Sequence, residues 1–363
     1  MISNSKLNNE TKLNHMRQLA EYRKQLCEKP RLHSLFIEMT TACNEHCRHC
    51  GSKCEKNVPI DILNADEIKN FLDTVKEDFD VSKIRLCITG GEPLLRTDFF
   101  EIMEYAHSLG FQWGMTSNGT LISEEIAQRL KAAGMKTISV SIDGLRDTHD
   151  WFRDSTGSYD RTIHGIENLL RQGFEHVQVT TVVHRRNINE LKKMYRQFRK
   201  LGIKSWRVIN VEPIGRALSD PEILLTDSQL KSMFRFIRKY RNKSEMEVCY
   251  GCSHYLGVEY EREVRKWYFL CNAGIYTASI CANGEIRACL DIERRDELIE
   301  GNIRKNRFSD IWKHGFKIYR TDFKKKGKCA DCEHYEFCVG DAYHSWDYDK
   351  NEPLLCLKGI MFE

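Results

Sequence analysis

The chain has 363 residues, of which 41% are hydrophobic and 30% are charged, so it can bury a substantial core in water. A formal net charge of only +4 does not indicate nucleic acid binding, and no apolar run is long enough to span a membrane. Because the first residues contain no apolar signal core, the 15 cysteines point to a reducing, cytoplasmic location and to metal binding instead of disulfide bonds.

Hydrophobic periodicity predicts one polar amphipathic helix at residues 6–28, followed by strands and helices in alternation. Six strands are expected, at residues 35–39, 84–89, 112–116, 137–142, 177–183 and 206–210. The helices that follow them are expected at residues 65–78, 99–109, 124–133, 159–172, 189–201 and 227–241. Regular strand–helix alternation is typical of a parallel sheet, and six units predict an open, partial parallel (β/α)6 barrel within the α/β class.

Three cysteines follow the first predicted strand at the spacing C-x3-C-x2-C, namely Cys43, Cys47 and Cys50. A 4Fe–4S cluster normally takes four cysteines, so three closely spaced ligands leave one iron for a small molecule or for a distant cysteine. The alternatives are buried structural thiols and a zinc knuckle completed by His46 or His49.

The segment Gly90-Gly91-Glu92-Pro93 follows the second predicted strand. Two glycines directly after a strand let the backbone approach a ligand closely, and Glu92 offers a carboxylate to an ammonium group. Taken alone, the same four residues are also a common turn signal.

Polar residues follow the later predicted strands as well, at Ser117, Asn118, Ser141, Asp143 and residues 210–212. Parallel α/β barrels place their active sites at the carboxyl ends of the strands, where all these residues and the cysteine loop are expected. The alternative for Asp143 is a turn that caps the strand end, and for Arg153, ten residues later, an ordinary surface arginine.

The last third of the chain contains nine of the 15 cysteines: Cys249, Cys252, Cys271, Cys281, Cys289, Cys329, Cys332, Cys338 and Cys356. A hairpin is predicted at residues 276–281 and 285–290, with its turn at Asn283-Gly284. The later group has the spacing C-x2-C-x5-C, which is poor for the alternative of a zinc ribbon.

The cysteine loop, the Gly-Gly-Glu-Pro segment one unit later and the cysteine-rich tail together resemble radical S-adenosylmethionine (radical SAM) enzymes with a C-terminal SPASM-type domain, the group of peptide maturases and anaerobic sulfatase maturases. The resemblance implies an N-terminal helix at residues 1–30, a radical SAM partial barrel at 31–244 and a small α+β auxiliary iron–sulfur domain at 245–363. In that family, an electron from the first cluster cleaves S-adenosylmethionine to a 5′-deoxyadenosyl radical, which abstracts a hydrogen atom from the substrate.

The resemblance also assigns roles to residues in the predicted barrel. Cys43, Cys47 and Cys50 are expected to hold the radical SAM 4Fe–4S cluster. S-adenosylmethionine is expected to contact Gly90, Gly91, Glu92, Pro93, Ser117, Asn118, Ser141, Asp143 and Arg153. In the family, the glycine-rich segment holds the methionine amino group, the polar groups after the fourth strand contact the ribose, and the arginine contacts the carboxylate. His49 stands where an apolar aromatic residue is common, and it can still lie against the adenine.

One or two auxiliary 4Fe–4S clusters are implied for the tail. One has a full ligand set in Cys329, Cys332, Cys338 and Cys356. The other has Cys271, Cys281 and Cys289, while Ala342 stands where the family has a further cysteine. Asp341, Cys252, His344 or no protein group at all are the open choices for its fourth ligand, and loss of this cluster is the alternative.

The resemblance predicts oxidative modification or cross-linking of a peptide or protein side chain, with an auxiliary cluster as the electron acceptor. The expected partners are this substrate, a reductase such as flavodoxin or ferredoxin and, because the segment before the first strand is short, a separate leader-binding protein; no nucleic acid or membrane partner is expected.

The enzymatic alternative to this prediction is radical SAM oxidation, epimerisation or rearrangement of a small molecule or cofactor precursor. An epimerase needs a thiol hydrogen donor, for which the candidates are Cys54, Cys249, Cys252 and Cys281. The non-enzymatic alternative is an electron-transfer or zinc-binding module.

Overall fold

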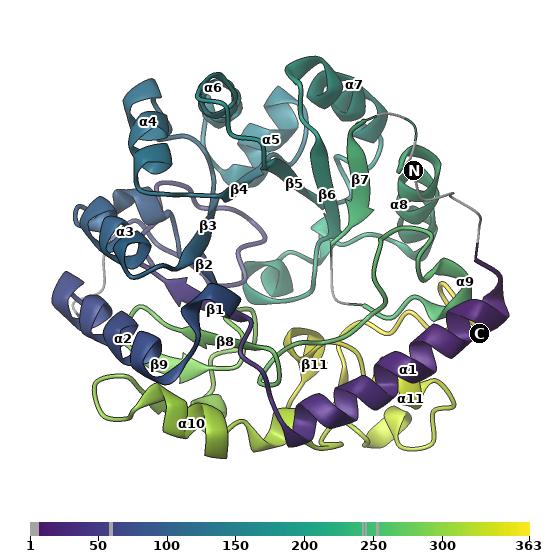
Figure 1. The fold of residues 1–363 in the computed structure, drawn as a ribbon. Coiled ribbons are helices and arrows are strands. Elements are labelled where there is room, and N and C mark those ends of the chain that lie inside the picture. Colours follow the sequence, from purple (N-terminus) through teal and green to yellow (C-terminus); the bar gives the residue numbers. More distant parts are fainter. Residues whose placement is uncertain (1–6, 58–60, 242, 244, 252–253) are drawn as a thin grey trace.

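The structure is a computed structural model that describes residues 7–57, 61–241, 243, 245–251 and 254–363. Cys252, one of the predicted candidates, lies outside these residues. Within the described residues, one curved ten-stranded sheet lies at the centre, and helices surround it (Figure 1).

Strands β1 to β7 lie side by side in sequence order, and each pairs in parallel with the next. Their bounds are β1 (Ser34–Glu38), β2 (Arg85–Thr89), β3 (Gln112–Ser117), β4 (Thr137–Ser141), β5 (Val177–Val183), β6 (Ser205–Asn210) and β7 (Glu247–Tyr250). The connecting helices are α2 (Ala65–Asp78), α3 (Phe99–Ser108), α4 (Glu124–Ala132), α5 (Arg146–Arg153), α6 (Ser158–Arg171), α7 (Leu191–Leu201) and α8 (Asp227–Tyr240). This arrangement confirms the predicted α/β class and parallel partial barrel.

The sheet is wider than the six strands that the sequence predicts. Strand β7 was missed because four residues are too few to show a periodic pattern. At the other edge, β8 (Thr277–Ile280) pairs in parallel with β1, and the predicted hairpin continues through β9 (Glu285–Arg287) and β10 (Gly301–Asn302). The hairpin is therefore confirmed, and it extends the barrel sheet.

Local chemistry explains where the helices begin. At α2 the Asn64 side chain accepts from the Glu67 amide, and the Glu67 carboxylate accepts from the Asn64 amide, which is a complete capping box. Helix α8 begins with the same arrangement at Thr226 and Gln229. Apolar side chains on the inner faces of these helices, such as Phe71 of α2, pack on the sheet and form the main core.

The N-terminal helix α1 (Asn9–Glu28) packs on the last third of the chain (Figure 1). It contacts the short helices α9 (Gly257–Tyr260) and α11 (Tyr335–Cys338), and its Lys12 Nζ donates to the Glu259 carbonyl at 2.7 Å. The tail also contains α10 (Phe308–His314) and a small hairpin of β11 (Trp346–Asp347) and β12 (Glu352–Pro353). The predicted domain boundaries stay predictions, although β7 and β8, beyond residue 244, belong to the barrel sheet. No helix among the described residues combines the length and the apolar character needed to cross a membrane.

Candidate active site

A cavity of about 570 Å³ lies among the loops after the parallel strands. It brings together most of the predicted residues, which are Cys43, Cys47, Cys50, Gly90, Gly91, Ser117, Asn118, Ser141, Asp143, Arg153, Cys271 and Cys289. Glu92 and Pro93, which follow Gly91 along the chain, are buried, and neither they nor Cys281 are among the residues that line the cavity. The cavity therefore joins thiols of the first loop with thiols of the tail.

The cysteine loop is fixed by backbone contacts on both sides. The Cys43 amide donates to the Glu55 carbonyl at 2.8 Å, and Arg216 donates to the carbonyls of Cys47 and Cys54 at 2.8 and 3.0 Å. Burial raises the pKa of Cys43 to about 11 and that of Cys47 to about 12. Buried thiols of this kind stay protonated unless a metal group takes them as thiolates. Among the described residues, no three His, Cys, Asp or Glu side chains lie close enough together to hold a metal ion. The argument for a cluster therefore rests on the spacing of the three cysteines in the sequence and on the cavity that they share.

Gly90 and Gly91 contact the backbone that leads into the cysteine loop. The Gly91 amide donates to the Thr40 carbonyl at 2.7 Å, and the Glu92 amide donates to the Ala42 carbonyl at 2.9 Å. A Cβ on Gly91 would lie 2.0 Å from the Ala42 carbonyl oxygen, and a Cβ on Gly90, which has a φ of +149°, would lie 2.4 Å from that of Thr40. The two glycines thus set the position of the cysteine loop as well as lining the cavity.

The variant Gly91→Ala is expected to lower the free energy of unfolding by about 1–3 kcal/mol, because backbone must move to admit the methyl group. Urea unfolding of the anaerobically purified protein measures this loss. Gly51→Ala is the control, since its Cβ would make an ordinary contact of 3.4 Å with the Ile214 side chain. Equal stability of the two variants would contradict the steric argument.

Glu92 is a fully buried carboxylate that accepts hydrogen bonds but forms no ion pair with a cationic side chain of the described residues. It accepts from the Ser117 hydroxyl at 3.0 Å and from the Asn118 amide at 2.8 Å. Burial raises its pKa to about 7, and these hydrogen bonds oppose the rise. A carboxylate in this condition fits the ammonium group that the resemblance assigns to it.

Arg153 lies between two acidic side chains and a cysteine. Its guanidinium is 2.5 Å from Asp143, 3.6 Å from Glu45 and 3.5 Å from the Cys47 sulfur. Burial by itself would lower the pKa of Arg153, but the charges of Asp143, Cys47 and Glu45 hold it well above its usual range. The buried Nε has no hydrogen-bond partner among the described residues, which leaves a donor for a carboxylate ligand. Sequence reasoning missed Glu45, and its position between the first two cysteines was the available signal.

His49 lines the cavity and stacks on a neighbouring ring. Its imidazole lies parallel to the Phe152 ring at 4.4 Å, and Phe152 stacks in turn on His184 at 3.9 Å. Burial lowers the pKa of His49 well below its usual range, so the ring is a neutral aromatic surface. One face of His49 is therefore already occupied, and its predicted contact with adenine stays a prediction.

The tail cysteines form two groups in space. Cys271 and Cys289 both line the main cavity. Cys281 lies instead beside Glu38 and Arg294, which form an ion pair of 2.5 Å, and burial raises its pKa to about 12. In the other group, Cys329 lies near Cys332 and Cys356, and Cys338 lies near Cys356. This grouping is consistent with the predicted four-thiolate cluster. The ligand roles of these four cysteines and of Cys281 stay predictions.

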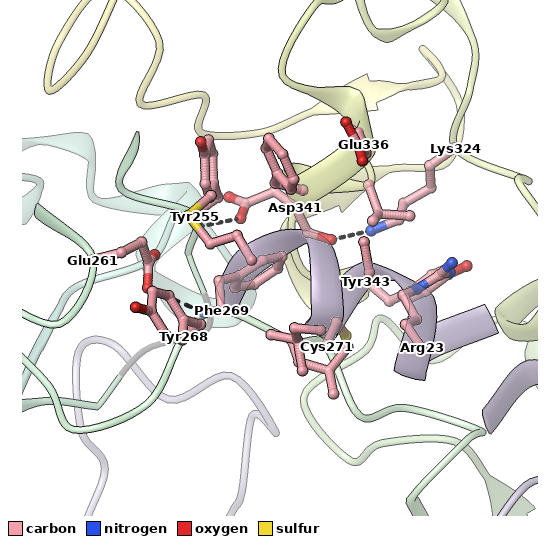
Figure 2. Close-up of a pocket in the computed structure, with 16 residues that line it drawn as sticks. Arg23, Tyr255, Glu261, Tyr268, Phe269, Cys271, Lys324, Glu336, Asp341 and Tyr343 are labelled. Atoms are coloured by element: carbon pink, nitrogen blue, oxygen red, sulfur yellow. Dashed lines mark hydrogen bonds between the residues drawn. The ribbon is translucent and has the colours of Figure 1, made fainter. Parts of the chain in front are cut away.

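Asp341 is engaged by other protein groups, beside a second and smaller pocket of about 30 Å³ between α1 and the tail (Figure 2). Its carboxylate accepts from the Tyr255 amide at 3.0 Å and from His254 Nδ1, and its carbonyl accepts from the buried Lys324 amine. These contacts leave Asp341 poorly placed to replace the cysteine expected at Ala342. His344, another predicted substitute, lines the main cavity.

Comparison with known proteins identifies the family of the chain. The family model of the Radical SAM superfamily matches residues 37–198, and the SPASM model, an iron–sulfur cluster-binding domain, matches residues 271–333. An AdoMet-dependent heme synthase of Methanosarcina barkeri (strain Fusaro / DSM 804) is 31% identical, over 89% of this chain and 95% of the relative. The mycofactocin maturase MftC of Mycobacterium tuberculosis (strain ATCC 25618 / H37Rv) is 28% identical, over 84% of this chain and 77% of the relative.

Two solved structures share the fold. Streptococcus suis SuiB bound to S-adenosylmethionine has a TM-score of 0.68 at 15% identity, over 86% of this chain and 73% of SuiB. The enzyme anSMEcpe with bound AdoMet and a Cp18Cys peptide has a TM-score of 0.68 at 19% identity, over 88% of this chain and 90% of that structure. With the two family models and a relative matched over nearly its whole length, the chain belongs to the radical SAM superfamily, as an enzyme of oxidoreductase type with a SPASM domain whose cofactors are S-adenosylmethionine and iron–sulfur clusters.

Proposed function

We propose that this enzyme removes a hydrogen atom from a peptide or protein side chain and passes a second electron from the substrate to an auxiliary cluster. The product is then an oxidised or cross-linked side chain. The observation that carries the proposal is the shared cavity, because Cys43, Cys47 and Cys50 line the same cavity as Cys271 and Cys289. A substrate radical formed there is close to an electron acceptor, which favours oxidation over a redox-neutral reaction.

Different residues of the barrel loops are proposed to bind different parts of S-adenosylmethionine. S-adenosylmethionine, when bound at the first cluster, would supply the hydrogen-abstracting agent, a 5′-deoxyadenosyl radical. Glu92 offers its buried carboxylate to the amino group of the methionine, and Arg153 offers its free Nε to the carboxylate. Ser117, Asn118, Ser141 and Asp143 supply polar contacts on the cavity wall. Holding both reactants in one cavity places the reacting C–H bond next to the radical and keeps other C–H bonds away from it.

The auxiliary ligands are proposed in two sets. Cys329, Cys332, Cys338 and Cys356 would hold one 4Fe–4S cluster, and Cys271, Cys281 and Cys289 would hold the other, with its fourth position open or taken by His344. The proposed division of the chain keeps the helix at 1–30, the barrel at 31–244 and the auxiliary domain at 245–363.

All described cysteines are free thiols, which supports a reducing, cytoplasmic location for the protein. In such a location, a reductase such as flavodoxin or ferredoxin is the proposed electron donor.

A peptide substrate is supported by relatives named as mycofactocin maturases and by the SuiB structure bound to the precursor peptide SuiA. The second candidate is a small molecule or cofactor precursor. It is favoured by one specific observation, the 31% identity to a heme synthase that is matched over 95% of its length. Both candidates use the same radical chemistry and differ in what enters the cavity.

The enzyme reduced with dithionite under anaerobic conditions is expected to convert S-adenosylmethionine to 5′-deoxyadenosine, measured by liquid chromatography. Cys47→Ala is expected to form none, because it removes one of three ligands of the first cluster. Cys27→Ala is the control, since Cys27 belongs to α1, outside the cavity, and its change should leave the yield unaltered. A wild-type protein that forms no nucleoside would refute the proposal and favour an electron-transfer or zinc-binding module.

A further inference from the structure

Glu212 lies just after β6 and is one of the residues that line the main cavity. Its side chain is 8% exposed, and its two oxygens are in different situations. Oε1 accepts from Asn210 Nδ2 at 2.8 Å and from His254 Nε2 at 2.5 Å. Oε2 is buried and has no hydrogen-bond partner among the described residues. A buried carboxylate oxygen without a partner is costly, so it is a site that a ligand can complete.

A line of three buried charges holds Glu212 in place. His254 is fully buried between Glu212 and Asp341, and each of its ring nitrogens contacts one of the two carboxylates. Burial by itself would lower the pKa of His254, but Asp341 and Glu212 hold it well above its usual range. The charged imidazole therefore donates on both sides. Asp341 is held in turn by two donors: its carboxylate accepts a hydrogen bond from the Tyr255 amide, and its carbonyl accepts one from the Lys324 amine (Figure 2).

The charges are unevenly placed along this line. Glu212 and Asp341 share one imidazolium, the buried Lys324 amine lies at the far end on the Asp341 carbonyl, and Glu212 is the member that reaches the cavity wall. Because Oε1 is occupied by two donors, the remaining oxygen can only accept a further hydrogen bond. The group that completes it must therefore be a donor, and a cationic donor forms the stronger, charge-assisted hydrogen bond with a carboxylate.

We propose that Glu212 Oε2 is a substrate subsite that binds an N–H donor, above all a protonated amine. This rests on the function proposed above, because it assigns the donor to the molecule that is oxidised. The subsite lies on the β6 side of the cavity, apart from Glu92 and Arg153, which are committed to S-adenosylmethionine in the proposed function. It gives the cavity a preference for substrates that carry an amine near the reacting carbon.

The test uses perdeuterated n-butylammonium as the probe and perdeuterated butanoate as its anionic counterpart. Binding to the anaerobically reconstituted protein with S-adenosylmethionine is measured by ligand-observed deuterium relaxation, which requires no turnover. Wild-type protein is expected to bind n-butylammonium about tenfold more tightly than butanoate, the factor of one charge-assisted hydrogen bond. Glu212→Gln is expected to remove this difference, because its amide oxygen stays with His254 and its NH₂ group replaces the acceptor.

Glu38→Gln is the matched control. Glu38 also lines the cavity and is buried, but both of its oxygens have donors, the Arg294 guanidinium at 2.5 Å and the Ala282 amide at 3.0 Å. This variant is expected to keep the preference for n-butylammonium. Thermal unfolding of the same samples shows whether Glu212→Gln is folded, and Glu212→Asp, which keeps the charge, should retain part of the preference.

A second readout follows deuterium from n-butylammonium into 5′-deoxyadenosine by mass spectrometry. Transfer from n-butylammonium in the wild type and its loss in Glu212→Gln would support the subsite. Equal binding of the two probes by the wild type, or unchanged binding by folded Glu212→Gln, would overturn it. A protein that binds n-butylammonium selectively but forms no 5′-deoxyadenosine would refute the proposed radical chemistry and leave the amine site standing.

Discussion

Replacing Cys43, Cys47 and Cys50 together by alanine is expected to remove about four irons per chain and to abolish 5′-deoxyadenosine formation. The three thiols lie on one loop and line one cavity, and two of them are buried thiols whose raised pKa values favour the protonated form without a metal. Iron and nucleoside are measured on anaerobically reconstituted protein. Cys87→Ala is the control, because Cys87 lies within β2 and is not among the residues that line the cavity, so its change should preserve both values.

The iron that remains in the triple variant counts the auxiliary clusters. About eight irons would mean two auxiliary clusters, so that another group or no protein ligand takes the place of the cysteine expected at Ala342. About four would mean that the set of Cys271, Cys281 and Cys289 holds no cluster. A value near zero would contradict auxiliary clusters in the tail altogether.

Asp341→Asn is expected to lower the free energy of unfolding by roughly 3–5 kcal/mol, the usual cost of breaking a buried ion pair from one side. The change leaves the buried His254 with one carboxylate instead of two. Urea unfolding under anaerobic conditions measures the loss. Asp349→Asn is the control, since the Asp349 side chain is 76% exposed in its pair with Arg295 and should matter little.

The buried charges of Glu212, His254 and Asp341 also predict how the free energy of unfolding depends on pH. The pKa of His254 is raised on folding, so its contribution is complete below the unfolded value of about 6.5 and is lost as the pH rises through the folded value. The pKa of Glu212 is lowered, so its contribution is complete above about 4.5 and is lost at more acidic pH. Wild-type stability should therefore fall as the pH rises above about 6.5, and the fall should be smaller in Asp341→Asn. If Asp341→Asn instead loses iron at unchanged stability, Asp341 is a cluster ligand.

Local patterns in the sequence were sufficient to predict most of the secondary structure. The helix expected at residues 65–78 is α2, with both bounds matched, and the strand expected at 177–183 is β5. These elements repeat their apolar residues over several turns or pairs, so the pattern is long enough to read. Strand β7 and helix α5 were not predicted because they are short, and the sheet pairing of β8 with β1 joins residues far apart in the chain.

The residues of the site also fall into those that local sequence patterns predict and those that only long-range contacts bring together. The sequence by itself determined the cysteine loop, the Gly-Gly-Glu-Pro turn and the thiol-rich tail, since each is a short-range spacing of reactive residue types. Only the tertiary structure placed tail cysteines Cys271 and Cys289 on the cavity of the first loop, and only it showed Cys281 beside Glu38. It also assembled Glu212, His254 and Asp341, which are 42 and 87 residues apart along the chain. A buried charge finds its partner through the packing of distant elements, and no local spacing in the sequence records that choice.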